Sequence, residues 1–341
     1  MNNCKIKNLT IYDISQEAGV SIATVSRVIN GSKNVSAKTR EKVLGIMSEY
    51  DFEPNLFARG LGTGSIKTIG ILCADVADLY LANAVSFLER ELKANGFDSV
   101  LYCTGFEHES KVRGLKTIES RHVDAVIMVG SHYVENINKK NNYIRETSKR
   151  IPIMMLNGYI DGENVCCAMS EDKIAFNSAT NKLIESGCNN ILFLYREDTY
   201  SKEEKLAGYL DALNSNDLGD KKNLLQVNSK IQVIKDKVSD TLKKETNIDA
   251  ILACDDELAI GAIKGAKAAG KDVPKEIQII GCNNSALSIC CEPELTTVDN
   301  MCEAMCISIV TLLVRTLEHQ VMPKKVMISC NLIERGTTRL R

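Results

Sequence analysis

Residues 9–30 read L-T-I-Y-D-I-S-Q-E-A-G-V-S-I-A-T-V-S-R-V-I-N, and this stretch predicts the first part of the fold. Its apolar residues recur at the spacing of two short amphipathic helices. Gly19 stands at the bend between them, where a positive φ is needed and glycine adopts it at little cost. The second helix would present Ile22, Ala23 and Arg27 on its outer face, and a helix exposed in this way can enter the major groove of DNA. We therefore expect a helix-turn-helix DNA-binding unit at the start of the chain.

The segment that follows predicts a third helix and then a hinge. Residues 35–50 have helical periodicity, with Ser36 as a suitable N-cap. The glycine-rich segment 55–65 is too short to form a stable helix alone in water, so we interpret it as a hinge that becomes helical when another surface holds it. The expected division is a DNA-binding domain over 1–54, this hinge, and a core over 66–341.

The composition favours a globular chain with a mildly basic start. Hydrophobic residues make up 44% of the chain and charged residues 25%, enough apolar material for a real core. Residues 1–67 carry nine basic and six acidic side chains, whereas the rest carries 33 and 38, which suits local contact with phosphates. No apolar run reaches membrane-spanning length, and the first residues lack the apolar core of a secretory signal. We therefore expect a cytoplasmic protein that does not contact a membrane.

Cysteine and histidine usage gives no sign of a metal centre. The thirteen cysteines are expected to be reduced thiols in a chain that is not exported. None of them forms a C-x-x-C pair, and the four histidines are scattered along the sequence. The sequence therefore predicts no bound metal and no cofactor, with most cysteines buried as small apolar side chains.

From residue 67 onward, candidate strands alternate with candidate helices. This alternation predicts parallel sheets with helices on both faces, and two sheets suit at least eight strands better than one. A single large doubly wound domain is the alternative. The expected strands are 68–73, 99–102, 125–129, 153–156, 191–194, 224–227, 250–253 and 278–281. The expected helices include 80–95, 173–186, 201–214, 256–269 and 301–318.

Several motifs follow one another along the chain. They include T-I-Y-D-I-S-Q-E-A-G-V-S-I-A-T-V-S-R-V-I-N-G, V-S-A-K-T-R-E-K-V, E-P-N-L-F-A-R-G-L, S-I-K-T-I-G-I-L, R-I-P-I-M-M-L-N, D-D-E-L-A-I-G-A, D-V-P-K-E-I-Q-I-I-G-C-N-N, P-E-L-T-T-V-D and I-E-R-G-T-T. With these motifs in this order, the sequence closely resembles the lac repressor/gal repressor family of bacterial transcription regulators over nearly its whole length. The resemblance implies an all-α helix-turn-helix head and an α/β core of two doubly wound parallel-sheet subdomains, periplasmic-binding-protein-like and joined by three crossovers. The first subdomain would comprise 66–160 plus 296–325, and the second 161–295 plus 326–341.

The resemblance also assigns roles in DNA binding. It implies that Ile22, Ala23 and Arg27 read bases. The arginine can bond guanine O6 and N7 together, which discriminates against a wrong base by about 1–3 kcal/mol. It implies that Leu61 of the hinge wedges into the minor groove and bends the duplex. Further contacts, mostly to phosphates, are expected from Thr10, Ser21, Thr24, Ser26, Asn30, Ser36, Thr39 and Asn55. The plainer alternatives are a surface arginine on an ordinary helical hairpin and a linker leucine that packs on the core.

An effector cleft between the subdomains is the second site that the resemblance implies. The residues carried over follow strand ends or begin helices: Asp78, Leu79, Tyr80, Asn157, Ser201, Lys205, Asp255 and Asn283. Three of them depart from the family, because Lys205, Asp255 and Asn283 stand where Arg, Asn and Asp are usual. Loss of the arginine removes a planar fork suited to bidentate hydrogen bonding. Taken singly, each could be an ordinary solvated residue at the end of a loop.

The leading hypothesis is a ligand-responsive transcription regulator, a repressor of carbohydrate-utilisation genes. As a homodimer it would bind double-stranded, pseudo-palindromic operator DNA, and a small-molecule effector such as a sugar would bind in the cleft. The alternative is an α/β enzyme acting on a sugar or nucleotide, with an accessory DNA-binding head. No G-x-S-x-G, P-loop or H-x-x-x-H pattern supports that alternative, so we expect no enzyme. A sugar transport receptor would require export.

Overall fold

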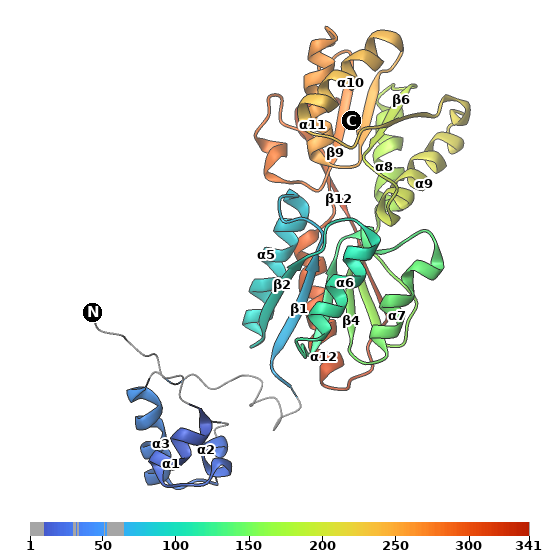
Figure 1. Cartoon of the computed structure of the whole chain (residues 1–341). Helices are drawn as coiled ribbons and strands as arrows, with labels where there is room; N and C mark the ends of the chain where they lie inside the picture. The colour runs from blue at the N-terminus through green and yellow to red at the C-terminus, as the bar shows by residue number, and fades with distance from the viewer. Residues whose placement is uncertain (1–9, 30–31, 33, 51, 53–64, 341) are drawn as a thin grey trace. The chain divides into compact units, whose positions relative to one another are not determined.

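The computed structural model describes residues 10–29, 32, 34–50, 52 and 65–340 (Figure 1). The chain divides into two units, residues 1–68 and 69–341. Within the described residues, no helix is both long and apolar enough to cross a membrane.

Three helices form the first unit, drawn in blue in Figure 1. They are α1 (Ile11–Ala18), α2 (Ile22–Ile29) and α3 (Ala37–Glu49). Helix α1 ends at Gly19, whose φ of 64° lies in the left-handed region that favours glycine, so the expected turn is confirmed. Helix α3 begins after Ser36, whose hydroxyl oxygen accepts a hydrogen bond from the Thr39 N–H at 3.2 Å.

A small apolar core holds these three helices together. Its buried members are Ile14 and Ala18 of α1, Val25 and Val28 of α2, and Val43 of α3. Because each helix buries one face against the other two, the opposite face of α2 is left exposed. The helix-turn-helix arrangement that the sequence predicts is therefore present.

Two six-stranded sheets form the centre of the second unit, and we call each sheet with its helices a lobe. The first sheet has the order β11-β5-β4-β3-β1-β2, from β1 (Thr68–Cys73), β2 (Asp98–Cys103), β3 (Ala125–Val129), β4 (Ile153–Leu156), β5 (Val165–Ser170) and β11 (Lys325–Ile328). The second has the order β12-β10-β9-β8-β6-β7, from β6 (Ile191–Tyr195), β7 (Asn223–Gln226), β8 (Ala250–Ala253), β9 (Gln278–Cys282), β10 (Thr296–Asp299) and β12 (Asn331–Ile333). The ladder between β10 and β12 is antiparallel, whereas β9 pairs parallel with both of its neighbours.

Helices cover both faces of each sheet. In the first lobe, α5 (Leu79–Ala94) and α12 (Cys302–Leu317) pack on one face, and α6 (His108–Glu119) and α7 (Asn142–Ser148) on the other. In the second lobe, α10 (Ile231–Lys244) and α11 (Asp256–Ala268) cover one face, and α8 (Asp172–Glu185) and α9 (Tyr200–Ser215) the other. Short 3-10 helices lie in the loops at η1 (Ser131–Tyr133), η2 (Asn138–Asn141), η3 (Gly219–Lys221) and η4 (Ala286–Ile289).

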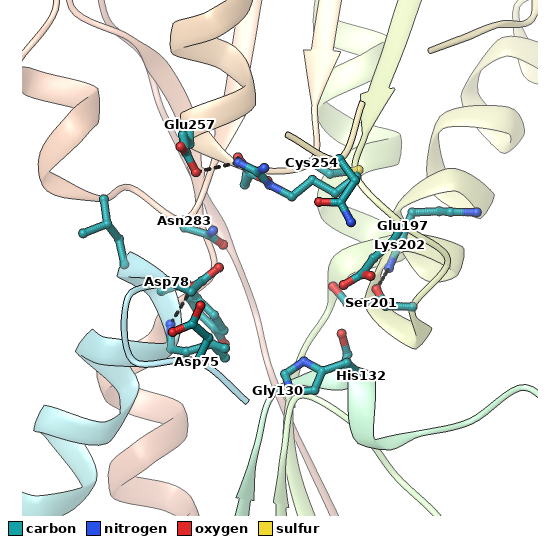
Figure 2. Close-up of a pocket in the computed structure, with 18 of the residues that line it drawn as sticks. Asp75, Asp78, Gly130, His132, Glu197, Ser201, Lys202, Cys254, Glu257 and Asn283 are labelled. Carbon is teal, nitrogen blue, oxygen red and sulfur yellow. Dashed lines mark hydrogen bonds and ion pairs between the residues drawn. The ribbon is translucent and has the colours of Figure 1, made fainter. Parts of the chain in front are cut away.

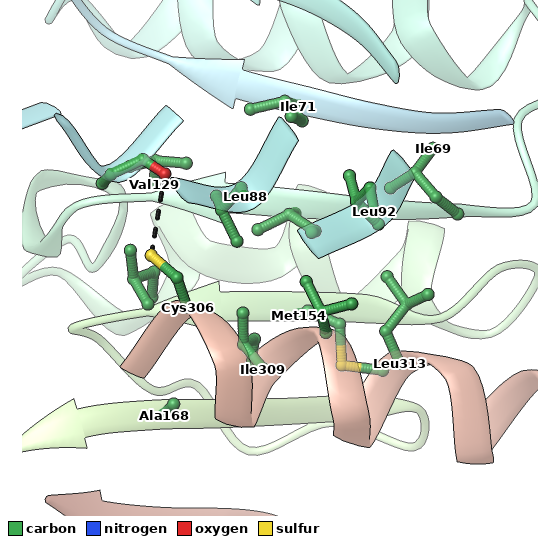
Figure 3. Close-up of a cluster of buried hydrophobic side chains, with 14 of the residues drawn as sticks. Ile69, Ile71, Leu88, Leu92, Val129, Met154, Ala168, Cys306, Ile309 and Leu313 are labelled. Atoms are coloured by element: carbon green, nitrogen blue, oxygen red, sulfur yellow. Dashed lines mark hydrogen bonds between the residues drawn. The ribbon is translucent and has the colours of Figure 1, made fainter. Parts of the chain in front are cut away.

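The core of the first lobe illustrates why its central strands are apolar throughout. Figure 3 shows Leu88 and Leu92 of α5 packed between Ile71 of β1 and the α12 residues Ile309 and Leu313. Every residue of β1 and β3 is buried, as expected for strands covered on both faces. The edge strands β2 and β7 instead contain only exposed and partly buried positions.

The chain passes between the two lobes three times, after β5, after β10 and between β11 and β12. The fold class and the number of crossovers agree with the prediction, but the expected internal boundaries do not coincide with the sheets. Strand β5 belongs to the first sheet and not to a second subdomain beginning at 161. Strand β10 belongs to the second sheet and not to a segment 296–325 of the first, and β11 extends in the first sheet to residue 328. These strands were not predicted, because no α-helix separates β4 from β5, β9 from β10 or β11 from β12.

Candidate functional site

The outer face of α2 carries the three side chains predicted to read bases. Ile22, Ala23 and Arg27 are exposed, and Ile22 retains 44% of its accessible surface. On the opposite face, Val25 and Val28 are buried in the core of the unit. An exposed arginine and an exposed isoleucine on one helical face give a surface able to meet both guanine edges and thymine methyl groups.

The polar residues predicted around this face form side-chain pairs at the three helix starts. Each pair bonds an N-terminal N–H of its helix, which satisfies groups left without partners inside the helix. Their contact with phosphate stays a prediction, as it does for Ser26, which is partly buried. Asn30, Asn55 and Leu61 lie outside the described residues. The pairs are Thr10 with Asp13 (2.7 Å between side-chain oxygens), Ser21 with Thr24 (2.9 Å) and Ser36 with Thr39 (2.8 Å).

A cavity of about 620 Å³ lies between the two lobes, at the carboxyl ends of their strands (Figure 2). Figure 2 shows Asp78 and Asn283 on one side of it and His132 and Ser201 on the other. All eight residues predicted for the effector cleft line this cavity: Asp78, Leu79, Tyr80, Asn157, Ser201, Lys205, Asp255 and Asn283. The structure therefore brings the whole predicted set together, as the topology of two open α/β sheets requires.

One wall of the cavity is built around Arg196, which follows β6. Its Nε lies 2.8 Å from Asp255 Oδ2, and its Nη2 lies 2.6 Å from Glu257 Oε2. Burial alone would lower the pKa of this guanidinium, but the carboxylates of Asp255 and Glu257 raise it above its ordinary value. Asp255 also caps α11, because it accepts the Leu258 N–H at 2.7 Å. The cleft therefore contains a rigidly held guanidinium, although the residue at 205 is a lysine.

Lys205 lies deeper in the cleft and is buried. Its ammonium group donates to the Cys254 carbonyl at 3.0 Å and sits 5.4 Å from the centre of the Phe176 ring. Within the described part of the chain, no carboxylate lies within ion-pair distance of this ammonium. Because a lysine carries three N–H donors, Lys205 can still donate to a ligand in the cavity.

A chain of buried polar groups runs from the first lobe to the second beneath the cavity. The Ser170 hydroxyl, at the end of β5, lies 3.1 Å from Asn157 Oδ1 and 2.7 Å from Asp172 Oδ1. Asp172 begins α8 and accepts a hydrogen bond from the Ser201 hydroxyl of α9. All four residues are buried, and the chain spans the first crossover. Asn157 and Ser201 also line the cavity. A ligand that contacts them would therefore also contact the hydrogen-bonded chain that joins the lobes.

Two polar atoms of the first lobe are buried at the cavity without a hydrogen-bond partner among the described residues. They are the Tyr80 hydroxyl and His132 Nε2. Burial, reinforced by the positive charge of Lys111, lowers the pKa of His132 to about 3, so the imidazole is neutral. Buried polar groups are nearly always paired in folded proteins, so both atoms are suited to bonding a ligand.

Several cavity residues were not predicted from the sequence. Each follows the end of a strand: Asp75 after β1, Phe106 after β2, His132 after β3 and Arg196 after β6. The rule that ligands bind beyond the carboxyl ends of strands would have found them, had it been applied to every strand. The prediction instead followed the resemblance, which pointed to fewer positions.

The described residues contain no group of three His, Cys, Asp or Glu side chains arranged to hold a metal ion. All twelve described cysteines are free thiols, and five of them are buried in strands or helices around the lobe cores. Burial raises the pKa of several of these thiols, to about 12 for Cys167, so they remain protonated at neutral pH.

Comparison with known protein families gives two matches. The model for bacterial regulatory proteins of the lacI family matches residues 10–55, and the periplasmic binding protein-like domain matches residues 180–338. An HTH-type transcriptional regulator from Lachnoclostridium phytofermentans is 47% identical over 331 residues, which cover 97% of this chain and 99% of that protein. Catabolite control protein A from Staphylococcus aureus is 32% identical over 297 residues, covering 85% of this chain and 87% of that protein.

Solved structures show the same fold. The lac repressor dimer bound to operator and the anti-inducer ONPF superposes with a TM-score of 0.87 at 22% identity, covering 97% of this chain and 99% of that chain. The complex of the transcriptional regulator CelR with cellobiose superposes with a TM-score of 0.70 at 24% identity, covering 96% and 99%.

Proposed function

The chain belongs to the lacI family of bacterial regulatory proteins, and we propose that it is a dimeric repressor of carbohydrate-utilisation genes that releases or grips its operator in response to a sugar. Membership of this family makes the chain a helix-turn-helix transcription regulator. The alternative of an α/β enzyme with an accessory DNA-binding head is not supported, because the relatives are regulators.

The observation that carries the DNA-binding part is the exposed row of Ile22, Ala23 and Arg27 on α2. In our proposal Arg27 bonds guanine O6 and N7, while Ile22 and Ala23 contact thymine methyl groups. The helix-start pairs and Ser26 would contact phosphates, together with Asn30 and Asn55. Leu61 would wedge into the minor groove from the hinge, which we place at 55–65 between a DNA-binding domain over 1–54 and the core.

We propose that the chain acts as a homodimer. The lac repressor, which has this fold, is a dimer on its operator. Two copies would set two recognition helices in successive major grooves, and the operator would then be a pseudo-palindrome with half-sites about one helical turn, or a multiple of it, apart.

The effector in our proposal is a sugar without a phosphate group. Six acidic and four basic side chains line the cavity, so its field does not favour an anion. The predicted residues other than Leu79, together with Arg196, supply hydroxyl-binding donors and acceptors, and Tyr80 offers an aromatic face. CelR, a protein of this fold, holds cellobiose.

Closure of the cleft is the proposed signal. A sugar bonded to Asn157 and Ser201 at once would favour one relative position of the lobes, because the two residues are joined through Ser170 and Asp172 across the first crossover. Differential affinity of the sugar for two positions of the lobes is what allostery requires. The hinge would respond through the first lobe, from which it emerges.

The test is selection of genomic DNA fragments by the purified full chain at physiological ionic strength, followed by footprinting. We expect a protected site with two-fold symmetry, and we expect one class of sugar to change its affinity. Equal affinity for all fragments would overturn the proposal of an operator-specific repressor. A site that no sugar affects would overturn the choice of effector alone.

A further inference from the structure

A second cavity of about 290 Å³ adjoins the main cleft between the lobes. It shares four lining residues with that cleft: Phe106, His132, Glu197 and Thr199. Its other walls come from Lys111 of α6, residues 134–137 and Lys140 in the first lobe, and from Asp198 in the second lobe. Because the two cavities share one set of walls, they form a single groove with two chambers, and we call the smaller one the second chamber.

An aromatic platform lies at the junction of the two chambers. The rings of Phe106 and His132 meet edge to face, with centroids 5.3 Å apart and planes at 65°. Phe106 retains 46% of its accessible surface although it is a large apolar side chain. An exposed aromatic face beside a polar cleft suits the apolar face of a sugar ring.

Three of the five charged side chains that line the second chamber form ion pairs, and the described residues show no ion pair for Lys140 or Glu197. The buried Lys111 ammonium lies 3.0 Å from Glu135 Oε1 and donates to the His132 carbonyl at 2.5 Å. On the second lobe, Asp198 pairs with Lys202 at 2.6 Å. An anionic ligand would meet three carboxylates and only two ammonium groups, one of which, Lys111, is already paired, whereas an uncharged ligand leaves the pairs intact. The chamber is therefore suited to a neutral group.

Hydrogen-bonding groups at the junction remain free. Among the described residues, the Glu197 side chain has no hydrogen-bond or ion-pair partner, although it is partly buried between the chambers. On the opposite lobe, the Nε2 atom of His132 is buried and has no hydrogen-bond partner among the described residues. A carboxylate and an unpaired imidazole nitrogen are suited to bond the hydroxyl groups of a ring that lies on Phe106.

We propose that the second chamber is a subsite for an additional sugar ring, so that the effector is an uncharged oligosaccharide of at least two rings that crosses the Phe106–His132 platform. This inference rests on the proposed function, because it concerns the same cleft. It adds the size and the charge of the effector, and it assigns Phe106 and Glu197 a role in selecting chain length.

The test is calorimetric titration of the full chain with matched series of one to three rings: glucose, cellobiose and cellotriose; xylose, xylobiose and xylotriose; mannose, mannobiose and mannotriose; galactose, galactobiose and galactotriose. We expect at least one series in which the second ring raises affinity tenfold or more. Monosaccharides that bind as tightly as their oligomers in every series would overturn the inference and leave the proposed function standing. Absence of binding in all series would overturn both.

Two variants of Phe106 test whether the gain in affinity from the second sugar ring depends on the second chamber. Phe106→Ala should lower affinity for the best oligosaccharide about tenfold and affinity for its monosaccharide much less, whereas Phe106→Tyr should retain both affinities. Ile174→Ala removes another exposed apolar side chain, on α8 outside both chambers, and should change neither affinity. An equal loss for one ring and for several rings in Phe106→Ala would show that the platform belongs to the main cleft, against the inference.

Discussion

Arg196 and Asp255 form an ion pair of 2.8 Å in the wall of the cleft, and the same carboxylate caps α11. The pair fixes the plane of the guanidinium, because Nη1 also donates to the Ser229 carbonyl at 3.0 Å. The cleft therefore still contains an arginine although residue 205 is a lysine, because Arg196 follows the end of β6 and lines the cleft.

Replacing Arg196 should weaken sugar binding. Arg196→Ala removes a charge-assisted donor worth about 1.5–3 kcal/mol, or roughly 10–100-fold in affinity. Calorimetry with the sugar that the full chain binds best would measure this loss. Arg150→Ala is the control, because it breaks an exposed ion pair with Glu119 far from the cleft. Unchanged sugar affinity in Arg196→Ala would remove Arg196 from the binding site.

Replacing Arg27 should cost DNA specificity and not folding. Arg27→Ala removes the proposed guanine contact, so affinity for the selected operator should fall by about 1–3 kcal/mol while affinity for unrelated DNA falls much less. Because the side chain is exposed, the melting temperature should not change. Fluorescence anisotropy with both DNAs measures the ratio of the affinity for the operator to the affinity for unrelated DNA. Lys264→Ala removes one exposed positive charge from α11 and should leave that ratio intact.

The sequence predicted the strands that helices separate and failed on those that no helix separates. Strands such as β1 and β3 are short apolar runs with helices after them, so they could be recognised locally. Strand β11 pairs with β5, whose partner residues lie about 160 positions away, and its burial alternates, so nothing nearby in the sequence marks it. The predicted cleft residues came together because they follow strand ends or lie in the first turns of a helix, whereas Arg196 was not predicted because the resemblance indicated residue 205.

Asp172 should be a structural connection between the lobes. Asp172→Ala removes the acceptor of the buried Ser201 hydroxyl and one of the two acceptors near the Ser170 hydroxyl, which should destabilise the second unit by about 1–3 kcal/mol. Urea unfolding followed by circular dichroism measures this change. Thr180→Val provides the control, since it removes a buried hydroxyl that bonds only within α8. If the free energy of unfolding falls by the same small amount in both variants, the polar chain does not hold the lobes together.

Stability should fall in acid because of His132. Burial, followed by the charge of Lys111, holds the pKa of this imidazole at about 3, against about 6.5 in the unfolded chain. Between these values the unfolded state binds a proton that the folded state does not, so the free energy of unfolding decreases as pH falls from about 6.5 toward 3. The slope attributable to this one group is at most about 1.4 kcal/mol per pH unit.

Urea titrations at pH 7 and pH 5 of the parent chain and of His132→Gln isolate this contribution. The raised pKa values of the Asp78 carboxyl and of the buried Asp256 carboxyl act in the opposite direction, and both groups remain in each protein, so their effect cancels in the comparison. We expect the parent to lose more stability than His132→Gln between the two pH values. His319→Asn, which replaces an exposed histidine, should lose as much as the parent. Equal losses in the parent and His132→Gln would mean that the imidazole titrates normally in the folded protein, and that it is not the buried neutral group at the junction of the two chambers.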